Sequence, residues 1–553
     1  MSADREERQG EDTPSRSSQD TLSYWGPAIA VSLSMFIAVI DSTLMNVAVP
    51  AIVSDFDTTV PVVQGAIALY SLVMAALMLP AGKLPSIYGV RRLMQVTLVI
   101  YAVGTLLAAI SWSPVVLYLG WSVIEGAAAA VLMPLTFTIL VVTYEGKDRA
   151  KALGLLAGVN ATGAAVGPIV GGALTTFASW RWGFALEAVV VVVALVFVRY
   201  VSAAPLGQGR DSLDLGGTAF SMIAATSLVV GLLLAGKFGW LVATRPFVAF
   251  GVQFNPFGTS PAVWLVGLSL LAFAAFAQYE RRLEQAGGSP LVPISMLTNR
   301  AFTAGTLTFG VRSLVMAGFI FVVPVFLQSG LGYTAFAAGV AMLPFSVGTL
   351  LVSTFTTGWR AYVSPKTLIQ IGIVLVGVGL ALLFVGTAPD QTIVGMAVPM
   401  AVIGIGVGLL MPQLVNMTLS SVPQANSAEA SGLMNATGML GYAIGTAVVG
   451  AFLLGQFYQG VTDGVLRASD VAVSIARRDE LARALQEASE TATEATREAF
   501  LAGLTTAEQE LLEGIFEAAM VGAQRATLLL LVLFVLLTLV VSAFLPRNIE
   551  FDS

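Results

Sequence analysis

The chain has 553 residues, of which 56% are hydrophobic and only 11% carry a formal charge. A soluble domain carries roughly a quarter charged residues, so this composition excludes a soluble globular protein and indicates a polytopic helical membrane protein. The chain has no cysteine and no histidine, which excludes disulfides, thiolate metal sites and the commonest metal ligand. We therefore expect no metal and no cofactor. The net charge of −6 argues against nucleic acid as a partner.

The chain opens with a charged, polar stretch over residues 1–22, which we expect to be a disordered tail in the cytoplasm. This stretch lacks the pattern of a cleavable signal peptide. Fourteen apolar segments follow, and each is long enough to cross a hydrocarbon core of ~30 Å. They cover 25–51, 60–80, 93–111, 114–142, 150–178, 182–201, 215–235, 261–279, 302–327, 335–358, 366–387, 392–415, 428–457 and 526–545.

The sequence repeats itself at two related offsets. Adding 278 to the numbering carries Gly154, Gly163 and Gly167 onto glycines in the second half, and a shift of 274 carries Val49-Pro50 onto another Val-Pro pair. These offsets pair the first six segments with the last six, as in many secondary transporters, and leave the seventh and eighth as an insertion. We expect an N-terminal six-helix bundle over 23–201, two inserted helices within 202–285 and a C-terminal six-helix bundle over 286–553.

Basic residues orient the predicted bundle. If the N-terminus is cytoplasmic, most Lys and Arg of the short loops fall on the cytoplasmic side, which predicts that both termini are cytoplasmic. Residues 458–525 then form an extracellular loop within the C-terminal bundle. Thr505 and Glu508 have capping-box spacing there, and we expect about two helices lying on the outer face. Residues 238–257 are expected to be an outer loop.

One stretch, from Arg149 to Trp182, is rich in evenly spaced glycines. On a helix this spacing makes one smooth face, so that a second helix can approach closely. Pro168 lies inside the apolar run, where neighbouring membrane helices can satisfy the carbonyl that it leaves free. The spacing alone favours a static packing helix, and the recurrence of the pattern in the second half weakens that interpretation. The glycines are Gly154, Gly158, Gly163, Gly167, Gly171 and Gly172.

Several motifs together resemble the major facilitator superfamily, and within it the fourteen-helix drug–proton antiporters. They include IDSTLMNVAVP (Ile40 to Pro50) in the first segment and SGLMNATG (Ser431 to Gly438) near the end. The strongest match is GAAVGPIVGG, whose Gly163, Gly167, Pro168, Gly171 and Gly172 resemble the antiporter motif of the fifth helix. The resemblance implies an all-α major facilitator fold with two six-helix pseudo-repeats plus two inserted helices.

Two motifs depart from the family pattern. The loop GKLPSIYGVRR, from Gly82 to Arg92, keeps Gly82, Gly89, Arg91 and Arg92 of the family's cytoplasmic gate but has Ser86 in place of its acid. The resemblance therefore implies a weakened gate and a protein that rests more inward-facing than its relatives. In the fourth helix, Trp121 occupies the family's Arg position and Glu125 its Gln position.

Four ionisable residues fall inside predicted spans, where an unpaired charge costs several kcal/mol and often marks function. Asp41 and Glu125 are candidates for proton coupling, with Arg312 on the repeat counterpart of the first segment. The alternative for both acids is a permanent salt bridge to Arg312. For Glu187 we expect an interfacial pair with Arg181.

The candidate coupling mechanism depends on burial. Burial raises the pKa of a carboxyl, and a nearby Arg lowers it again. Because no histidine is present, a carboxyl must carry any titrating proton. Thr43 and Asn46, three residues apart on the first segment, are added as candidates for substrate contact.

Together these patterns predict a monomeric, multi-pass protein of the plasma membrane that exports amphipathic or cationic compounds in exchange for protons. Its expected partners are a small-molecule substrate, protons and membrane lipids. One alternative is transport of a lipid, siderophore or metabolite on the same fold, and another is an uncoupled homologue that acts as a sensor or scaffold. No GxxxxGK[ST] sequence is present, which argues against pumping driven by ATP.

Overall fold

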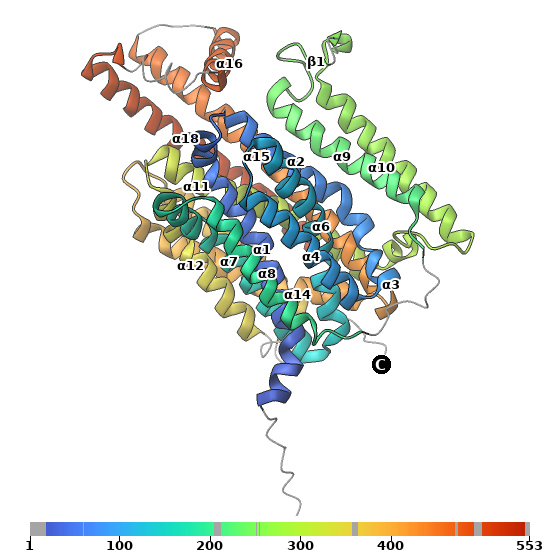
Figure 1. The fold of residues 1–553 in the computed structure, drawn as a ribbon. Helices are drawn as coiled ribbons and strands as arrows, with labels where there is room; N and C mark the ends of the chain where they lie inside the picture. Colours follow the sequence, from blue (N-terminus) through green and yellow to red (C-terminus); the bar gives the residue numbers. More distant parts are fainter. Residues whose placement is uncertain are drawn as a thin grey trace, which may run out of the picture.

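The structure is a computed structural model, and it describes residues 18–58, 60–203, 212–249, 252–253, 255–356, 363–469, 474–491, 500 and 502–547. Most of the predicted N-terminal tail lies outside these residues. The predicted all-helical class is confirmed, because long helices make up the body of the molecule (Figure 1). Among the described residues, twelve helices are long and apolar enough to cross a membrane, and a shorter apolar stretch covers Gly65–Ala81.

The first part of the chain forms six long helices and several short ones. They are α1 (Ser18–Asp55), α2 (Val60–Ala81), α3 (Leu84–Tyr88), α4 (Val90–Ala109), α5 (Pro114–Leu117), the π-helix η1 (Tyr118–Glu125), α6 (Gly126–Thr143), α7 (Gly146–Phe177) and α8 (Arg181–Val198). Next come α9 (Leu215–Phe238), the strands β1 (Val248–Ala249) and β2 (Val252–Gln253), and α10 (Pro261–Gln285).

The last part of the chain repeats the six-helix pattern with longer final helices. It contains α11 (Arg300–Val325), the π-helix η4 (Phe326–Gly330), α12 (Ala335–Phe355), α13 (Pro365–Gly386), α14 (Ile393–Ser420), α15 (Ser427–Ala468), α16 (Ile475–Thr491) and α18 (Thr506–Ser542). Short 3-10 turns cover Pro256–Gly258, Ile294–Thr298 and Gln424–Asn426.

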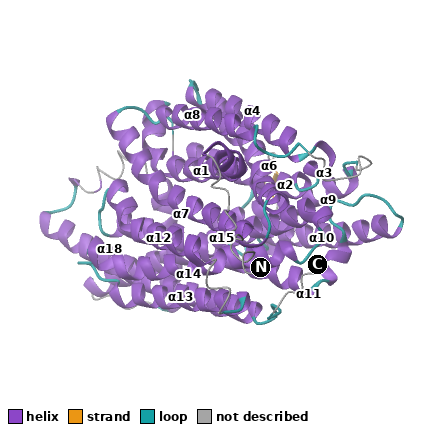
Figure 2. Cartoon of the chain, turned by 90° about the horizontal axis from the view of Figure 1, so that it is seen from below, coloured by secondary structure: helices purple, strands orange, loops and turns teal. Residues whose placement is uncertain are grey.

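The two sets of helices pack in the same way. In the N-terminal half (α1 to α8), α1 packs against α7 and α8, and in the C-terminal half (α11 to α18), α11 packs in the same manner against α15 and α18. Contacts of α7 with α12 and of α15 with α2 join the two halves. Figure 2 shows the helices of both halves end-on, with α7, α12 and α15 in the middle.

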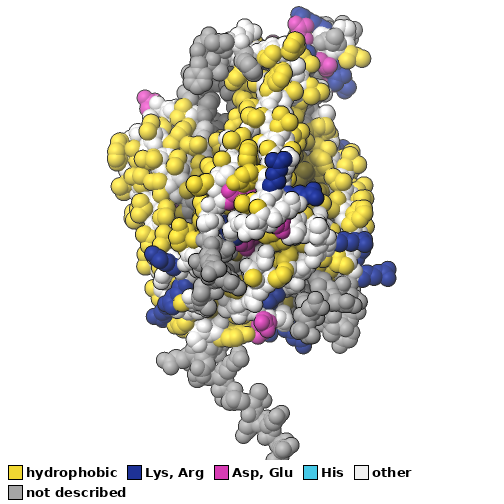
Figure 3. All heavy atoms as spheres, turned by 90° about the vertical axis from the view of Figure 1, so that its right-hand side faces the viewer, with side chains coloured by type: hydrophobic (Ala, Val, Ile, Leu, Met, Phe, Trp, Pro, Cys, Tyr) yellow, Lys and Arg dark blue, Asp and Glu magenta, His cyan; other side chains and the backbone are white. Residues whose placement is uncertain are grey.

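The α9–α10 pair lies on the flank of the bundle. Its helices pack against each other along their length, and α9 also contacts α2 and α15 (Figure 1). Figure 3 shows this flank covered mostly by hydrophobic side chains, with most of the visible Lys and Arg in its lower half. The chain between α9 and α10 forms the small antiparallel hairpin of β1 and β2. The described residues of that segment contain no helix longer than a single 3-10 turn.

The start of α1 and the end of α18 lie at the same end of the molecule. Tyr24 donates a hydrogen bond to Asp148 at the start of α7, and Arg149 next to it donates to Ser420 at the end of α14. Arg300, at the start of α11, donates to the carbonyl of Phe544 just after α18. The structure therefore places both ends of the helical body together.

The segment 458–525 differs from its prediction. Instead of about two separate helices on the outer face, α15 continues unbroken to Ala468 and α18 already begins at Thr506, so both extend beyond the rest of the bundle (Figure 1). No proline interrupts either extension, and the composition favours helix. The segment also contains a separate helix, α16, which is tied to α15 by an ion pair of 2.6 Å between Arg478 and Asp463. The predicted capping box of Thr505 and Glu508 is confirmed.

Candidate functional site

The glycine face of α7 lies against α1, as the glycine spacing predicts. A Cβ added at Gly163 would lie 3.1 Å from Val39, one at Gly171 would lie 3.2 Å from Leu44, and one at Gly167 would overlap Thr43. At Gly167 a side chain would require Thr43 or the helices to move, whereas at Gly163 and Gly171 a small shift would suffice. Gly172 also lies in α7, and the side chain of Pro168 is outside the described part of the structure.

The other end of α7 uses its glycines against the opposite half. A Cβ at Gly154 would overlap the carbonyl of Ser353, and one at Gly158 would overlap Leu350, both on α12. The glycines of α7 therefore allow close packing against two helices, α1 in the same half and α12 in the other half.

Three buried carboxyl groups meet inside the N-terminal half. They belong to Asp41 on α1, Glu125 at the end of η1 and Glu187 on α8, and their oxygens lie within 4.8 Å of one another. Asp41 and Glu125 have no exposed surface, and Glu187 is 2% exposed. We call these three residues the carboxyl cluster.

Two hydrogen bonds hold the carboxyl cluster in place. The indole Nε1 of Trp121 donates to Asp41 over 2.7 Å, and the hydroxyl of Thr105 donates to Glu125 over 2.7 Å. Trp121 is also stacked on Tyr70, with ring centroids 4.8 Å apart. The change from the family's Arg to Trp121 therefore replaces a positive charge with a neutral donor.

The local backbone explains how Glu125 reaches its partner. Tyr118–Glu125 is a π-helix, a form that is rare and frequent at functional sites. Helix α4 lies very close to it, since a Cβ at Gly104 would be 2.7 Å from the carbonyl of Gly120. This close approach brings Thr105, the residue after Gly104, beside the Glu125 carboxyl.

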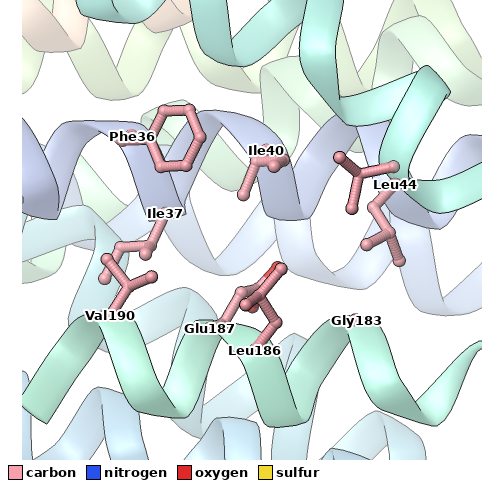
Figure 4. Close-up of a pocket in the computed structure, with 9 residues that line it drawn as sticks. Phe36, Ile37, Ile40, Leu44, Gly183, Leu186, Glu187 and Val190 are labelled. Carbon is pink, nitrogen blue, oxygen red and sulfur yellow. The ribbon is translucent and has the colours of Figure 1, made fainter. Parts of the chain in front are cut away.

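The expected pair of Glu187 with Arg181 is wrong. Arg181 instead forms an ion pair of 2.7 Å with Asp55 and donates to the carbonyl of Ser111. Glu187 points from α8 toward α1, beside a small cavity that also borders Ile40 and other apolar residues (Figure 4). Neither of its carboxyl oxygens has a hydrogen-bond partner. Because Glu187 lies only a turn and a half from Arg181 along the chain, the sequence favoured an ion pair between them and gave no sign that Glu187 is buried.

The alternative of a permanent salt bridge to Arg312 is also not found. Arg312 lies in the C-terminal half, where it donates to the hydroxyl of Ser313 over 3.1 Å and lies 5.0 Å from the ring centroid of Phe309. Its Nε is buried without a partner, and no described carboxylate lies within ion-pair distance of its side chain. It lines a second small cavity together with apolar residues that include Val315 and Val376.

Of the two polar candidates on α1, Thr43 does not join the cluster. The hydroxyl of Thr43 donates to the carbonyls of Val39 and Ile40 in its own helix, and Thr43 packs against Gly167 of α7. The side chain of Asn46 lies outside the described residues. The structure therefore assigns Thr43 to helix packing.

The altered gate loop has an acid partner after all, supplied by the other half. Lys83 Nζ and the hydroxyl of Ser86 both donate to Glu429 Oε1 at the start of α15, over 2.8 and 3.0 Å. All three side chains are buried, at 5%, 4% and 4% exposure. We call Lys83, Ser86 and Glu429 the latch. Ser86 supplies no acid, as the sequence implies, and the acid of this contact comes from Glu429 on the opposite half. That the protein rests more inward-facing than its relatives stays a prediction.

The backbone around the latch is fitted to it. A Cβ at Gly82 would lie 2.7 Å from the Cα of Gly432, so α15 touches the end of α2 directly. Gly89 has a φ of 76°, which suits glycine and separates α3 from α4. Arg91 is half-buried and Arg92 exposed, and neither forms an ion pair with a described residue.

Comparison with known proteins agrees with this architecture. The family described as Major Facilitator Superfamily matches residues 31–446. The chain belongs to the major facilitator superfamily. As a member of this transporter family it is not an enzyme.

Among curated relatives of this transporter are two export or resistance proteins of actinomycetes. The cephamycin export protein CmcT of Amycolatopsis lactamdurans is 30% identical over 423 residues, which cover 75% of this chain and 82% of that protein. The puromycin resistance protein pur8 of Streptomyces alboniger is 26% identical, over 83% of this chain and 89% of that protein.

Solved structures support the fold of this transporter. A proton:xylose symporter, XylE, matches with a TM-score of 0.54 at 12% identity, over 95% of this chain and 97% of that one. The human organic anion transporter MFSD10 matches with a TM-score of 0.52 at 10% identity, over 93% and 99%. At such low identity these matches bear on the fold alone.

Proposed function

We propose that this transporter has fourteen membrane-spanning helices and exports amphipathic or cationic organic compounds across the plasma membrane in exchange for protons. The observation that carries the proposal is the buried carboxyl cluster, to which no basic side chain in the described part of the chain forms an ion pair. Three such acids cannot all stay ionised when they are buried so close together, so protons must bind there. The name of one relative, the cephamycin export protein CmcT, supports export as the direction of transport.

Topology follows from the same proposal. The α1 start and α18 end lie at the latch end, and we assign that end to the cytoplasm because of its basic loops. The domain division is a six-helix bundle over 23–201, an inserted pair within 202–285 and a second bundle over 286–553. Cysteines placed at Ser364 and Ser113 of this cysteine-free chain test the assignment. Labelling of Ser364 only from the cytoplasm and of Ser113 only from outside would agree with it.

The latch gives the proposed cycle its inner gate. In the described residues, the hydrogen bonds between the two halves include Lys83 to Glu429, Arg149 to Ser420 and Ser431 to Pro134. We propose that these contacts close the cytoplasmic side and must separate before substrate can enter from the cell.

The test is transport in proteoliposomes with and without an imposed proton gradient. The expected result is movement of a lipophilic cation, such as tetraphenylphosphonium, that follows the gradient and stops when an uncoupler removes it. Liposomes with the Asp41→Asn variant serve as the control. Transport of neutral lipids or metabolites, or no transport, would favour the alternatives of a different substrate class or of an uncoupled sensor.

A further inference from the structure

Glu187 is a third acid in the carboxyl cluster, although it lies on α8 and far along the chain from the other two. Its oxygens lie within 4.8 Å of oxygens of Asp41 and Glu125. Asp41 and Glu125 each accept one hydrogen bond, from Trp121 and Thr105, whereas neither oxygen of Glu187 accepts any. A buried carboxylate with no donor is costly, so the group needs a proton of its own or one from a neighbouring acid.

Among the residues that the structure describes, no basic side chain forms an ion pair with Glu187. The groups that face it are Asp41 from α1 and Glu125 from η1, with the hydroxyls of Tyr70 on α2 and Tyr101 on α4 behind them. Both hydroxyls are buried without a hydrogen-bond partner. Helix α7 carries no charged residue beyond Lys151, and Arg181 on α8 is bound to Asp55 and Ser111.

The size of the site restricts its ligand. Asp41 and Glu125 have no exposed surface, and the small cavity beside Glu187 is otherwise lined by apolar residues such as Phe36, Leu44 and Val190 (Figure 4). An organic cation cannot lie between oxygens that are at most 4.8 Å apart. A proton can.

We propose that Glu187 is a proton-binding residue and that the carboxyl cluster works as one site that takes up and releases more than one proton in each transport cycle. This inference rests on the proposed proton-coupled function. When the cluster releases one proton, the negative charge that results is shared by three close acids. Acids that interact so strongly titrate together, so each apparent pKa describes the whole cluster and not one residue.

Infrared difference spectroscopy of the purified full-length protein tests the inference without any substrate. A pH step ionises protonated carboxyls, and each one lost removes intensity from the C=O stretching region. Glu187→Gln should remove one such band and move the titration midpoints of the remaining cluster bands by about one pH unit or more. The matched control is Glu280→Gln, which removes a buried carboxyl on α10 outside the cluster and should leave the cluster bands in place.

Two results would overturn the inference. One is a Glu187→Gln spectrum with no band lost between about pH 5 and pH 9, which would mean that Glu187 does not titrate in a useful range. The other is loss of one band with the remaining bands unmoved, which would mean that Glu187 acts alone. If Glu187→Gln does not fold, Glu187→Asp keeps a carboxyl, and its band should reappear at a shifted frequency and midpoint.

Transport separates this inference from the proposed function. In proteoliposomes at a pH difference of about one unit, loss of one coupled proton should lower the steady-state gradient of tetraphenylphosphonium roughly tenfold in Glu187→Gln. A wild-type gradient in that variant would overturn the role of Glu187 and leave proton-coupled export intact. If the wild-type protein moves no cation, the proposed function fails, and the infrared bands still decide whether Glu187 shares protons with the cluster.

Discussion

The two halves of the transporter place opposite charges at corresponding depths of the same packing arrangement. In the N-terminal half, the carboxyl cluster and its donors come from α1, α4, η1 and α8. In the C-terminal half, α11, α13, α14 and α18 enclose the cavity that Arg312 lines. The repeat offset of 274 carries Asp41 onto Val315, which lies one turn after Arg312 and borders the same cavity.

The two halves share their helix packing but differ in the charge of their buried residues. The helix packing is shared, but an acid can lose its charge by binding a proton, whereas an arginine keeps its charge at every physiological pH. The carboxyl cluster can therefore change its charge by binding protons, whereas Arg312 cannot. The latch reverses the allocation, with the base on the N-terminal half and the acid on the C-terminal half.

The largest effect is expected from the acids of the N-terminal half. Asp41→Asn and Glu125→Gln should each lower gradient-driven efflux at least about tenfold, because an amide keeps the shape of the group but binds no proton. Binding of the transported cation to purified protein should remain measurable in at least one variant. Full gradient-driven efflux in both variants, measured in proteoliposomes, would remove the distinction between the two halves.

The next effect concerns the latch. Glu429→Gln leaves Lys83 buried without its partner, which typically costs about 3–5 kcal/mol in the closed state. The variant should spend more time inward-facing, and a cysteine at Ala51 near the outer end of α1 should react more slowly with an external reagent. The exchange Lys83→Glu with Glu429→Lys should restore the wild-type rate. Unchanged labelling in Glu429→Gln would show that other contacts keep this side closed.

A smaller effect is expected from the cation of the C-terminal half. Arg312→Met removes a buried charge that has no described counter-ion, so the free energy of unfolding should stay level or rise by about 1–4 kcal/mol. Thermal unfolding in detergent measures it, with Arg312→Lys as the variant that keeps the charge. The ratio of protons to transported cation should stay at its wild-type value. Loss of coupling as severe as in Asp41→Asn would mean that the two interiors act together.

The smallest effect is expected from an acid in place of Ser86, which tests whether a second acid in the latch stabilises or destabilises the closed state. Ser86→Asp restores the acid of the family pattern but places it beside Glu429, where it adds repulsion and removes the donating hydroxyl. We expect a loss of about 1 kcal/mol in the closed state and slower labelling at Ala51, the opposite of what the family pattern implies. Faster labelling would show that Lys83 can hold both acids and that the family's arrangement still applies here.

Sequence periodicity sufficed for the elements with a strong local signal. Each apolar segment contains one long helix, the capping box at Thr505 is present, and the glycines of α7 meet α1 as their spacing predicts. These features depend on residues that are close together in one helix, or on glycines spaced along one helix face. Both patterns can be recognised in the sequence.

Contacts between distant helices could not be predicted in this way. The offset of 278 carries Lys151 onto Glu429, so the change from a base to an acid at the equivalent repeat position is visible in the sequence. Nothing in the sequence connects Glu429 with Lys83, which is 346 residues away. The bond from Trp121 to Asp41 and the burial of Glu187 likewise depend on how α1, η1 and α8 pack.

The position of α9 has a mechanical consequence. This helix touches α2 of one half and α15 of the other, so it spans a seam along which the halves meet. When the halves rock, α9 must slide along at least one of its two neighbours. A compound that entered from the bilayer through the α2–α15 seam would have to pass α9, which lies across it.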